Sequence, residues 1–187
     1  MERRLVLQGI GAGLLVGAGI AMAEDPKGAV AKDGGIEQLQ RTWKSLLAQN
    51  AKVAADASPV VKPDDEWRKT LDPAAYAVLR HEGTERPFSS PLNDEHRAGV
   101  FVCAGCALPL FTSAMKFDSG TGWPSYFTTI PGAFASKTDN KMILPRTEYH
   151  CAKCGGHHGH VFDDGPAPTG LRYCNNGVAL RFIPRQA

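Results

Sequence analysis

The sequence predicts a mainly β fold with antiparallel sheets, preceded by short helices. The chain contains 20 glycines and 13 prolines, and most of them lie from residue 83 onward, where they mark turns. Short runs of β-branched, aromatic and other apolar residues separate these turns. This pattern favours antiparallel sheets over strand–helix–strand units. With 187 residues, 43% of them apolar, the chain suits one globular domain with extensions.

The formal net charge is +2 and aromatic residues make up 8% of the chain. A balance so close to neutral gives no support to nucleic-acid binding or to a polybasic membrane patch. We therefore expect no nucleic-acid partner. Separately, we expect a monomer.

Residues 1–23 are predicted to be an export signal peptide. A basic start at Arg3 and Arg4 precedes an apolar, glycine-rich run at 5–20, and residues 21–23 offer a small-x-small cleavage pattern. The apolar run of about 16 residues is shorter than the roughly 20 that span a bilayer, so we prefer a cleaved signal to a membrane anchor. The paired arginines partly resemble a twin-arginine signal. We expect an exported, periplasmic protein.

Residues 24–63 are predicted to be an extension or linker with a candidate helix at 36–48. Ile36, Leu39 and Trp43 supply an apolar stripe at helical spacing. The alanine-rich stretch after this helix ends in two prolines and is interpreted as a linker.

The main domain is expected at residues 64–184, followed by a tail at 185–187. It should begin with helical turns, because residues 64–66 are acidic, as first turns often are, and Asp72 precedes Pro73 as an N-cap precedes a first-turn proline. Four strand candidates follow, at 100–102, 141–144, 147–150 and 178–183.

Four of the five cysteines form two Cys-x-x-Cys pairs. The first pair is Cys103 and Cys106, and the second is Cys151 and Cys154. Two such pairs can supply the four corners of a tetrahedral zinc site, which would be structural because no coordination position stays open. Two disulfides are the alternative for an exported protein, although a disulfide within one Cys-x-x-Cys pair would be strained. We prefer the structural zinc.

Cys174 is the cysteine without a partner. Arg172 lies two residues before it and Asn176 two residues after it, so on a strand the three side chains would share one face. A nearby cation lowers the pKa of a thiol and makes it more reactive. An inert buried cysteine is the alternative reading.

Three histidines, His157, His158 and His160, follow the second cysteine pair. They could form a metal cluster or a solvated loop. Since imidazole gains and loses protons near neutral pH, we favour proton transfer as their role.

Five ordered motifs, with the two cysteine pairs counted together as one, resemble those of the B-type methionine sulfoxide reductases, which act on the R epimer. Besides the two cysteine pairs, the resemblance is carried by residues 81–89, 116–127, 157–165 and 170–176, and it covers about residues 64–184. It implies a fold of two antiparallel sheets with short N-terminal helices and a zinc site opposite the active site.

The resemblance also implies the reaction and its central residues. Cys174 would attack the sulfoxide sulfur, releasing methionine and leaving a sulfenic acid on the enzyme. His157 and His160 would line the pocket, with His160 as the preferred proton donor to the sulfoxide oxygen. The substrate would be an oxidised protein or peptide.

Other motif positions would bind or orient the substrate. Asp164, Arg172 and Asn176 match polar pocket residues. Trp123 matches an aromatic wall that receives the substrate methyl group, and Phe127 is assigned to substrate binding with it.

One position departs from the pattern of some family members. Thr121 occupies a site where those members carry a recycling cysteine, and no cysteine remains outside the two pairs. We therefore expect an external thiol, from a thioredoxin-like protein or another thiol reductant, to reduce the sulfenic acid of Cys174. Two other functions stay open at this point, a zinc-stabilised binding module without catalysis and a thiol-disulfide oxidoreductase.

Overall fold

The structure is a computed structural model that describes residues 34–142 and 144–186. The predicted export signal at 1–23 and the start of the extension lie outside these residues. Within the described part of the chain, no helix is both long and apolar enough to span a membrane.

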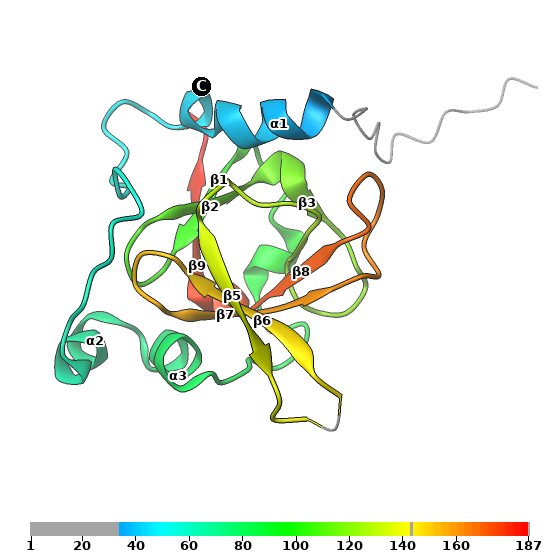
Figure 1. The fold of residues 1–187 in the computed structure, drawn as a ribbon. Coiled ribbons are helices and arrows are strands. Elements are labelled where there is room, and N and C mark those ends of the chain that lie inside the picture. Colours follow the sequence, from blue (N-terminus) through cyan, green and yellow to red (C-terminus); the bar gives the residue numbers. More distant parts are fainter. Residues whose placement is uncertain (1–33, 143, 187) are drawn as a thin grey trace, which may run out of the picture.

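The described residues are mainly β, as predicted, and the three α-helices among them lie outside the two sheets (Figure 1). In chain order the helical segments are α1 (Gly34–Arg41), η1 (Thr42–Leu46), α2 (Asp64–Thr70), α3 (Pro73–His81), η2 (Pro91–Asp94), η3 (Ser113–Met115) and η4 (Gly177–Ala179). The strands are β1 (Gly99–Cys103), β2 (Pro109–Thr112), β3 (Lys116–Phe117), β4 (Ser125–Tyr126), β5 (Phe134–Asp139), β6 (Arg146–Cys151), β7 (His157–Phe162), β8 (Arg172–Asn175) and β9 (Leu180–Pro184).

Both sheets are antiparallel throughout. The smaller sheet has the order β2-β1-β9, and the larger has the order β3-β4-β8-β7-β6-β5. The large sheet therefore brings β8, near the end of the chain, between two strands that precede it in the sequence. This crossing places Cys174 beside the histidine-rich strand.

The helix predictions are confirmed with small changes. The candidate helix at 36–48 is shorter, because α1 ends at Arg41 and continues as the 3-10 helix η1 to Leu46. Its apolar side packs on the core, and Gln40 donates a hydrogen bond to Thr128. Helix α3 begins at Pro73 after Asp72, as expected, although the Asp72 side chain makes no capping hydrogen bond.

The strand prediction at 141–144 is wrong. Strand β5 ends at Asp139 and β6 begins at Arg146, so this apolar run lies in the connection of the hairpin. Met142 and Leu144 there are 60% and 76% exposed. Strand β5 itself was missed because its sequence is mostly polar and exposed, as on an edge strand, and lacks an alternating apolar face. The candidate at 178–183 begins as a 3-10 turn and becomes strand β9 at Leu180.

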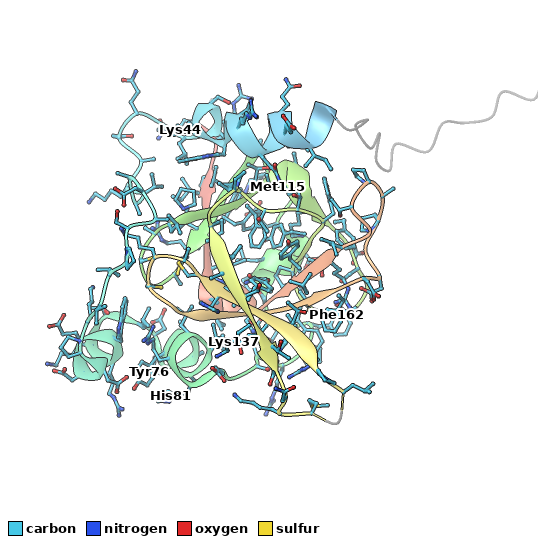
Figure 2. All side chains as sticks on the ribbon, viewed as in Figure 1. Lys44, Tyr76, His81, Met115, Lys137 and Phe162 are labelled. Carbon is cyan, nitrogen blue, oxygen red and sulfur yellow. The ribbon has the colours of Figure 1, made fainter. Side chains whose placement is uncertain are left out.

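Aromatic side chains of the two sheets fill the core. Phe111 of β2 stacks on Tyr126 of β4 with ring centroids 3.8 Å apart, and Phe101 of β1 meets the same tyrosine edge-on at 5.2 Å. Figure 2 shows Met115 in this interior, below α1. The core thus fixes the large sheet from its inner face and leaves the other face of β7 and β8 for chemistry.

Candidate active site and metal centre

Three strands place the candidate catalytic side chains in one row. In the register of the large sheet, Cys174 of β8 lies opposite His160 of β7 and, on its other side, opposite Ser125 of β4. Residues directly opposite each other on antiparallel strands project from the same face, with Cβ atoms about 4.5–5.5 Å apart. The sheet therefore brings the thiol and an imidazole together from positions 14 residues apart in the chain.

Cys174 and His160 line a cavity of about 140 Å³. Such a volume corresponds to a few water molecules, so it suits the end of one side chain. The residues around it are Thr84, Trp123, Arg146, Gly159, His160, Phe162, Cys174, Asn175 and Asn176.

The Cys174 thiol is half-buried. Burial raises its pKa, whereas the charge of Arg172 and polar contacts to Thr121 and Arg172 oppose part of that rise. The thiol thus rests in its protonated form at neutral pH and must lose its proton during any reaction as a nucleophile.

His160 is held by a carboxylate from another strand. Its Nε2 lies 2.8 Å from Oδ2 of Asp139, which also accepts a hydrogen bond from Arg146 Nη2 at 2.6 Å. Burial lowers the pKa of His160, and Asp139 opposes part of this shift. The imidazole is accordingly neutral near pH 7.

Arg172 and Asp164 form a bidentate ion pair. The Arg172 Nε and Nη2 atoms donate to the two Asp164 oxygens at 2.8 and 2.9 Å, and the guanidinium lies 4.4 Å from the ring centroid of Phe162. Arg172 is buried while the Asp164 side chain is 58% exposed. The pair holds the guanidinium near Cys174, where its charge lowers the pKa of the thiol and the charge of Asp164 opposes part of that effect.

Asn176 and Trp123 are both fixed by Glu85. Asn176 Oδ1 accepts from the Glu85 backbone N–H at 2.9 Å, and Trp123 Nε1 donates to the Glu85 carbonyl at 3.2 Å. The Glu85 carboxylate accepts from the N–H groups of Gly177 and Val178. This network holds the indole and the segment after Cys174 in one arrangement.

Four predicted site residues do not line the cavity: Arg172 and Asp164, described above, and His157 and Phe127. His157 is 3% exposed, and its Nδ1 lies 2.9 Å from Glu148 Oε1 while its ring centroid is 5.5 Å from that of His160. Phe127 follows β4, where its backbone N–H and C=O are bonded to Met115 and Thr169. Neither side chain lines the cavity around Cys174.

Sequence reasoning missed Asp139, Arg146 and Glu85. Asp139 and Arg146 close the β5–β6 hairpin as a cross-strand pair. Because β5 was not recognised as a strand, no local pattern linked its last residue to His160. Glu85 lay in a recognised motif, but only the folded loop shows its contacts.

The four remaining cysteines converge on one point. Their sulfur atoms all lie within 4.8 Å of one another, with Cys103 Sγ 3.7 Å from Cys154 Sγ and Cys106 Sγ 3.5 Å from Cys151 Sγ. All five cysteines are free thiols, so the disulfide alternative is not realised. A tetrahedral zinc site with Zn–S bonds of about 2.3 Å requires sulfurs about 3.8 Å apart, and these residues fit a metal of that kind.

The predicted linker and helix α3 connect the two Cys-x-x-Cys pairs, each of which we call a cysteine hook. The backbone N–H groups of Ala54 and Val60 donate to the carbonyls of Ala107 and Lys153, one beside each hook, at 2.9 and 2.7 Å. Arg80 of α3 donates to the Cys154 carbonyl at 2.9 Å. The stretch at 51–60 is therefore a strap across the metal centre.

An apolar groove of about 890 Å³ lies on the opposite face of the large sheet from Cys174, because its lining residues Val161 and Tyr173 alternate with His160 and Cys174 along β7 and β8. Arg146 and Phe162 line both spaces. Figure 2 shows Phe162 at the far end of β7 from α2 and α3. The groove is bounded by Val161, Leu171 and Tyr173 on one side and by the exposed Met142 and Leu144 at its edge.

Comparison with known proteins gives one consistent result. Residues 71–184 match the SelR domain. The peptide methionine sulfoxide reductase MsrB of Bradyrhizobium diazoefficiens is 50% identical over 139 residues, which are 73% of this chain and 99% of that protein. Those of Agrobacterium fabrum and Pseudomonas putida strain GB-1 are 53% and 52% identical, over 68% and 67% of this chain and 96% and 97% of their own lengths.

Proposed function

Since the chain belongs to the SelR-domain family of B-type peptide methionine sulfoxide reductases, we propose that it reduces (R)-methionine sulfoxide in proteins through the thiol of Cys174. The chain is an oxidoreductase of this family. The observation that carries the catalytic assignment is the row in the large sheet in which Cys174 lies opposite His160 at the cavity.

In the proposed reaction, Cys174 Sγ attacks the sulfoxide sulfur. The sulfur–sulfur bond formed in this attack breaks again as the oxygen moves from the substrate sulfur to Sγ, and the products are methionine and a sulfenic acid. Two electrons pass from the cysteine sulfur to the substrate sulfur. His160 transfers the proton that the sulfoxide oxygen needs, because that oxygen leaves poorly without one.

Residues at the cavity and beside it contribute charge and shape to the reaction. Arg172, held by Asp164, favours the thiolate as it forms. Trp123 supplies the apolar wall for the substrate methyl group, and Asn176 contributes its amide edge. The predicted roles of His157 and Phe127 are proposed only as indirect ones, because His157 lies beside His160 and neither side chain lines the cavity.

The sulfenic acid is proposed to be reduced by an external thiol. Thr121, in contact with Cys174, provides no sulfur for an internal disulfide, and the other four cysteines are gathered in the metal centre. A thioredoxin-like protein or a small thiol would then attack the sulfenic sulfur, release water and form a mixed disulfide.

Zinc is the metal proposed for the four cysteines. Four buried or half-buried sulfurs at tetrahedral spacing favour a soft divalent ion, and two hooks leave no open position for a substrate. The ion would hold β1–β2 and β6–β7 together at their turns, next to the strap.

A polypeptide is the proposed form of the substrate. The Cys174 cavity accommodates only the end of a side chain, whereas the groove is large and apolar. Arg146 and Phe162 line both spaces, so we propose that residues beside an oxidised methionine pass these two side chains to reach the groove while the sulfoxide occupies the cavity.

Export to the periplasm remains part of the proposal, and its support is the sequence of residues 1–23. A monomer is proposed with it. The molecular mass of the protein purified from the periplasmic fraction would test cleavage after residue 23, and an intact N-terminus in that fraction would contradict it.

The function is tested with separated R and S epimers of dabsyl-methionine sulfoxide and a dithiol reductant. We expect the wild-type protein to consume the R epimer and the Cys174→Ser variant to be inactive. Turnover of the S epimer, or full activity of the variant, would contradict the assignment.

The groove is tested with a peptide whose oxidised methionine has apolar neighbours. Replacing Leu144 by serine should raise KM for this peptide about tenfold, as expected for about 1.4 kcal/mol of lost apolar contact, and leave KM for the free sulfoxide unchanged. Val61→Ser, at a side chain 94% exposed elsewhere, is the control. If Leu144→Ser and Val61→Ser have equal KM values for the peptide, the groove takes no part in substrate binding.

A further inference from the structure

Asp139 holds His160 by a short contact from a neighbouring part of the sheet. The carboxylate is 6% exposed, and its Oδ2 lies 2.8 Å from His160 Nε2. Arg146 Nη2 donates to the same oxygen at 2.6 Å, and the backbone N–H of Lys141 donates to Oδ1 at 2.9 Å. Neither oxygen is left without a donor.

These donors decide which nitrogen of His160 carries hydrogen. The Lys141 N–H, His160 and Arg146 together hold the pKa of Asp139 well below its usual range. An ionised carboxylate can only accept hydrogen bonds, so Nε2 of His160 must be the N–H donor. In the neutral ring, Nδ1 is then the basic nitrogen.

We propose that Asp139 is a positioning residue for sulfoxide reduction, which fixes His160 as the Nε2–H tautomer and leaves Nδ1 to carry the proton between Cys174 and the substrate oxygen. This inference rests on the proposed function and adds the group that orients its proton carrier. The arrangement of nucleophile, imidazole and carboxylate is the logic by which other enzymes activate a weak nucleophile.

The proton path follows from the protonation states. Cys174 begins as a thiol, because burial raises its pKa, and His160 begins neutral. Nδ1 accepts the thiol proton as Sγ attacks the sulfoxide sulfur, and the imidazolium then gives this proton to the departing oxygen, which becomes the sulfenic O–H. One thiol and one sulfoxide thus yield one sulfenic acid and one thioether, with no proton gained or lost.

Among the charged groups around His160, Asp139 is the one placed to orient its ring. Arg146, from β6, disfavours the imidazolium, as does His157 on β7 itself. Glu148, which lies opposite His160 in the register, is engaged by His157 and by Lys137 at 3.3 Å. On β8 the facing group is the Cys174 thiol. Within the described residues, Asp139 alone makes a carboxylate hydrogen bond to His160.

The test compares Asp139→Asn with Asp139→Glu and with wild type in single turnover. The readout is sulfenic acid formed per unit time, so that the reductant plays no part, measured from pH 5 to pH 9. Asp65→Asn is the control, since it removes a carboxylate from an exposed helix pair with Lys69.

We expect Asp139→Asn to slow sulfenic acid formation about 10- to 100-fold, part of the range that general acid–base catalysis provides. The acidic limb of its pH–rate profile should move to lower pH by roughly one unit, because the lost anion had favoured the imidazolium. Asp139→Glu should retain the position of this limb, and Asp65→Asn should match wild type. An unchanged rate and limb in Asp139→Asn would overturn the proposal.

A second measurement uses the wild-type protein, so it holds even if the variants fold poorly. The imidazole ¹⁵N shifts of His160 at pH 8 should identify Nε2 as protonated and Nδ1 as bare. The opposite tautomer would overturn the proposal. A wild-type protein that consumes no sulfoxide would instead refute the proposed function, whatever the tautomer.

Discussion

Replacing Gly159 by alanine should displace the strand that carries Cys174. Gly159 lies on β7 opposite Asn175 and lines the catalytic cavity. A Cβ atom added there would stand 1.9 Å from the Cys174 carbonyl oxygen, with the backbone in a conformation (φ 156°) that favours glycine. The obstructing atom belongs to the backbone, so no side-chain rotation can relieve the contact.

The size of the effect follows from that distance. Because Cβ atoms essentially never come within 3.0 Å of another heavy atom, β7 and β8 must separate by about 1 Å. A misplacement of about 1 Å at a reacting group can cost about 100-fold in rate. Overpacking of this kind also costs about 1–3 kcal/mol of stability.

The assay is the initial rate of (R)-methionine sulfoxide reduction at saturating reductant, with thermal unfolding and zinc content measured on the same samples. We expect the rate to fall about 100-fold while the metal content stays constant. The control is Gly132→Ala, which also has positive φ (75°) but no heavy atom within 4 Å of the added Cβ. It should lose stability without losing activity. Wild-type activity in Gly159→Ala would refute the reasoning.

Three further predictions address the metal, the surface and the recycling step. Purified protein should contain one zinc per chain by elemental analysis, and Cys106→Ser should abolish it and lower the melting temperature; metal-free wild type that melts unchanged would contradict a structural zinc. Ion pairs with Lys137 and a second lysine lower the pKa of Glu82 to about 2. Its ionised form should therefore contribute about 1 kcal/mol to the free energy of unfolding above pH 4.5, and this contribution is lost as pH falls toward 2. Glu82→Gln should therefore melt lower than wild type at pH 7, the difference should shrink as pH falls from 4.5 toward 2, and a constant difference would contradict this pairing. After one equivalent of substrate, mass spectrometry should find a sulfenic acid at Cys174 with no internal disulfide in wild type, and a disulfide in Thr121→Cys; a wild-type disulfide to a hook cysteine would exclude the external-thiol route.

Short patterns with strict chemical demands could be predicted from the sequence. Two Cys-x-x-Cys pairs indicated a four-sulfur site, and their sulfurs do meet. Cys174 stood out because it had no partner, and the turn-rich composition indicated antiparallel sheets, which the structure confirms. Each of these features depends on residues close together in the chain or on composition.

Features that depend on distant residues could not be predicted in this way. Strand β5 is polar and exposed, so it has no alternating apolar face, while the apolar run at 141–144 resembles a strand but lies in a loop. Asp139, the last residue of β5, reaches His160 only because β5, β6 and β7 pair in the register observed. The strap at 51–60 likewise has the composition of a linker, and its bonds to the two hooks exist only in the folded chain.

The sequence by itself determined which chemistry this protein carries: a lone thiol, neighbouring imidazoles and four metal-binding sulfurs, since side-chain identity sets what each group can donate, accept or attack. Only the tertiary structure decided how that chemistry is arranged. Strand pairing put Cys174 opposite His160 and Asp139 on its Nε2 nitrogen, and the packing of two loops put the Glu85 carbonyl on the Trp123 indole N–H. Hydrogen bonds and protonation states depend on a few ångströms and on burial, and both arise when strands far apart in the chain come to lie side by side.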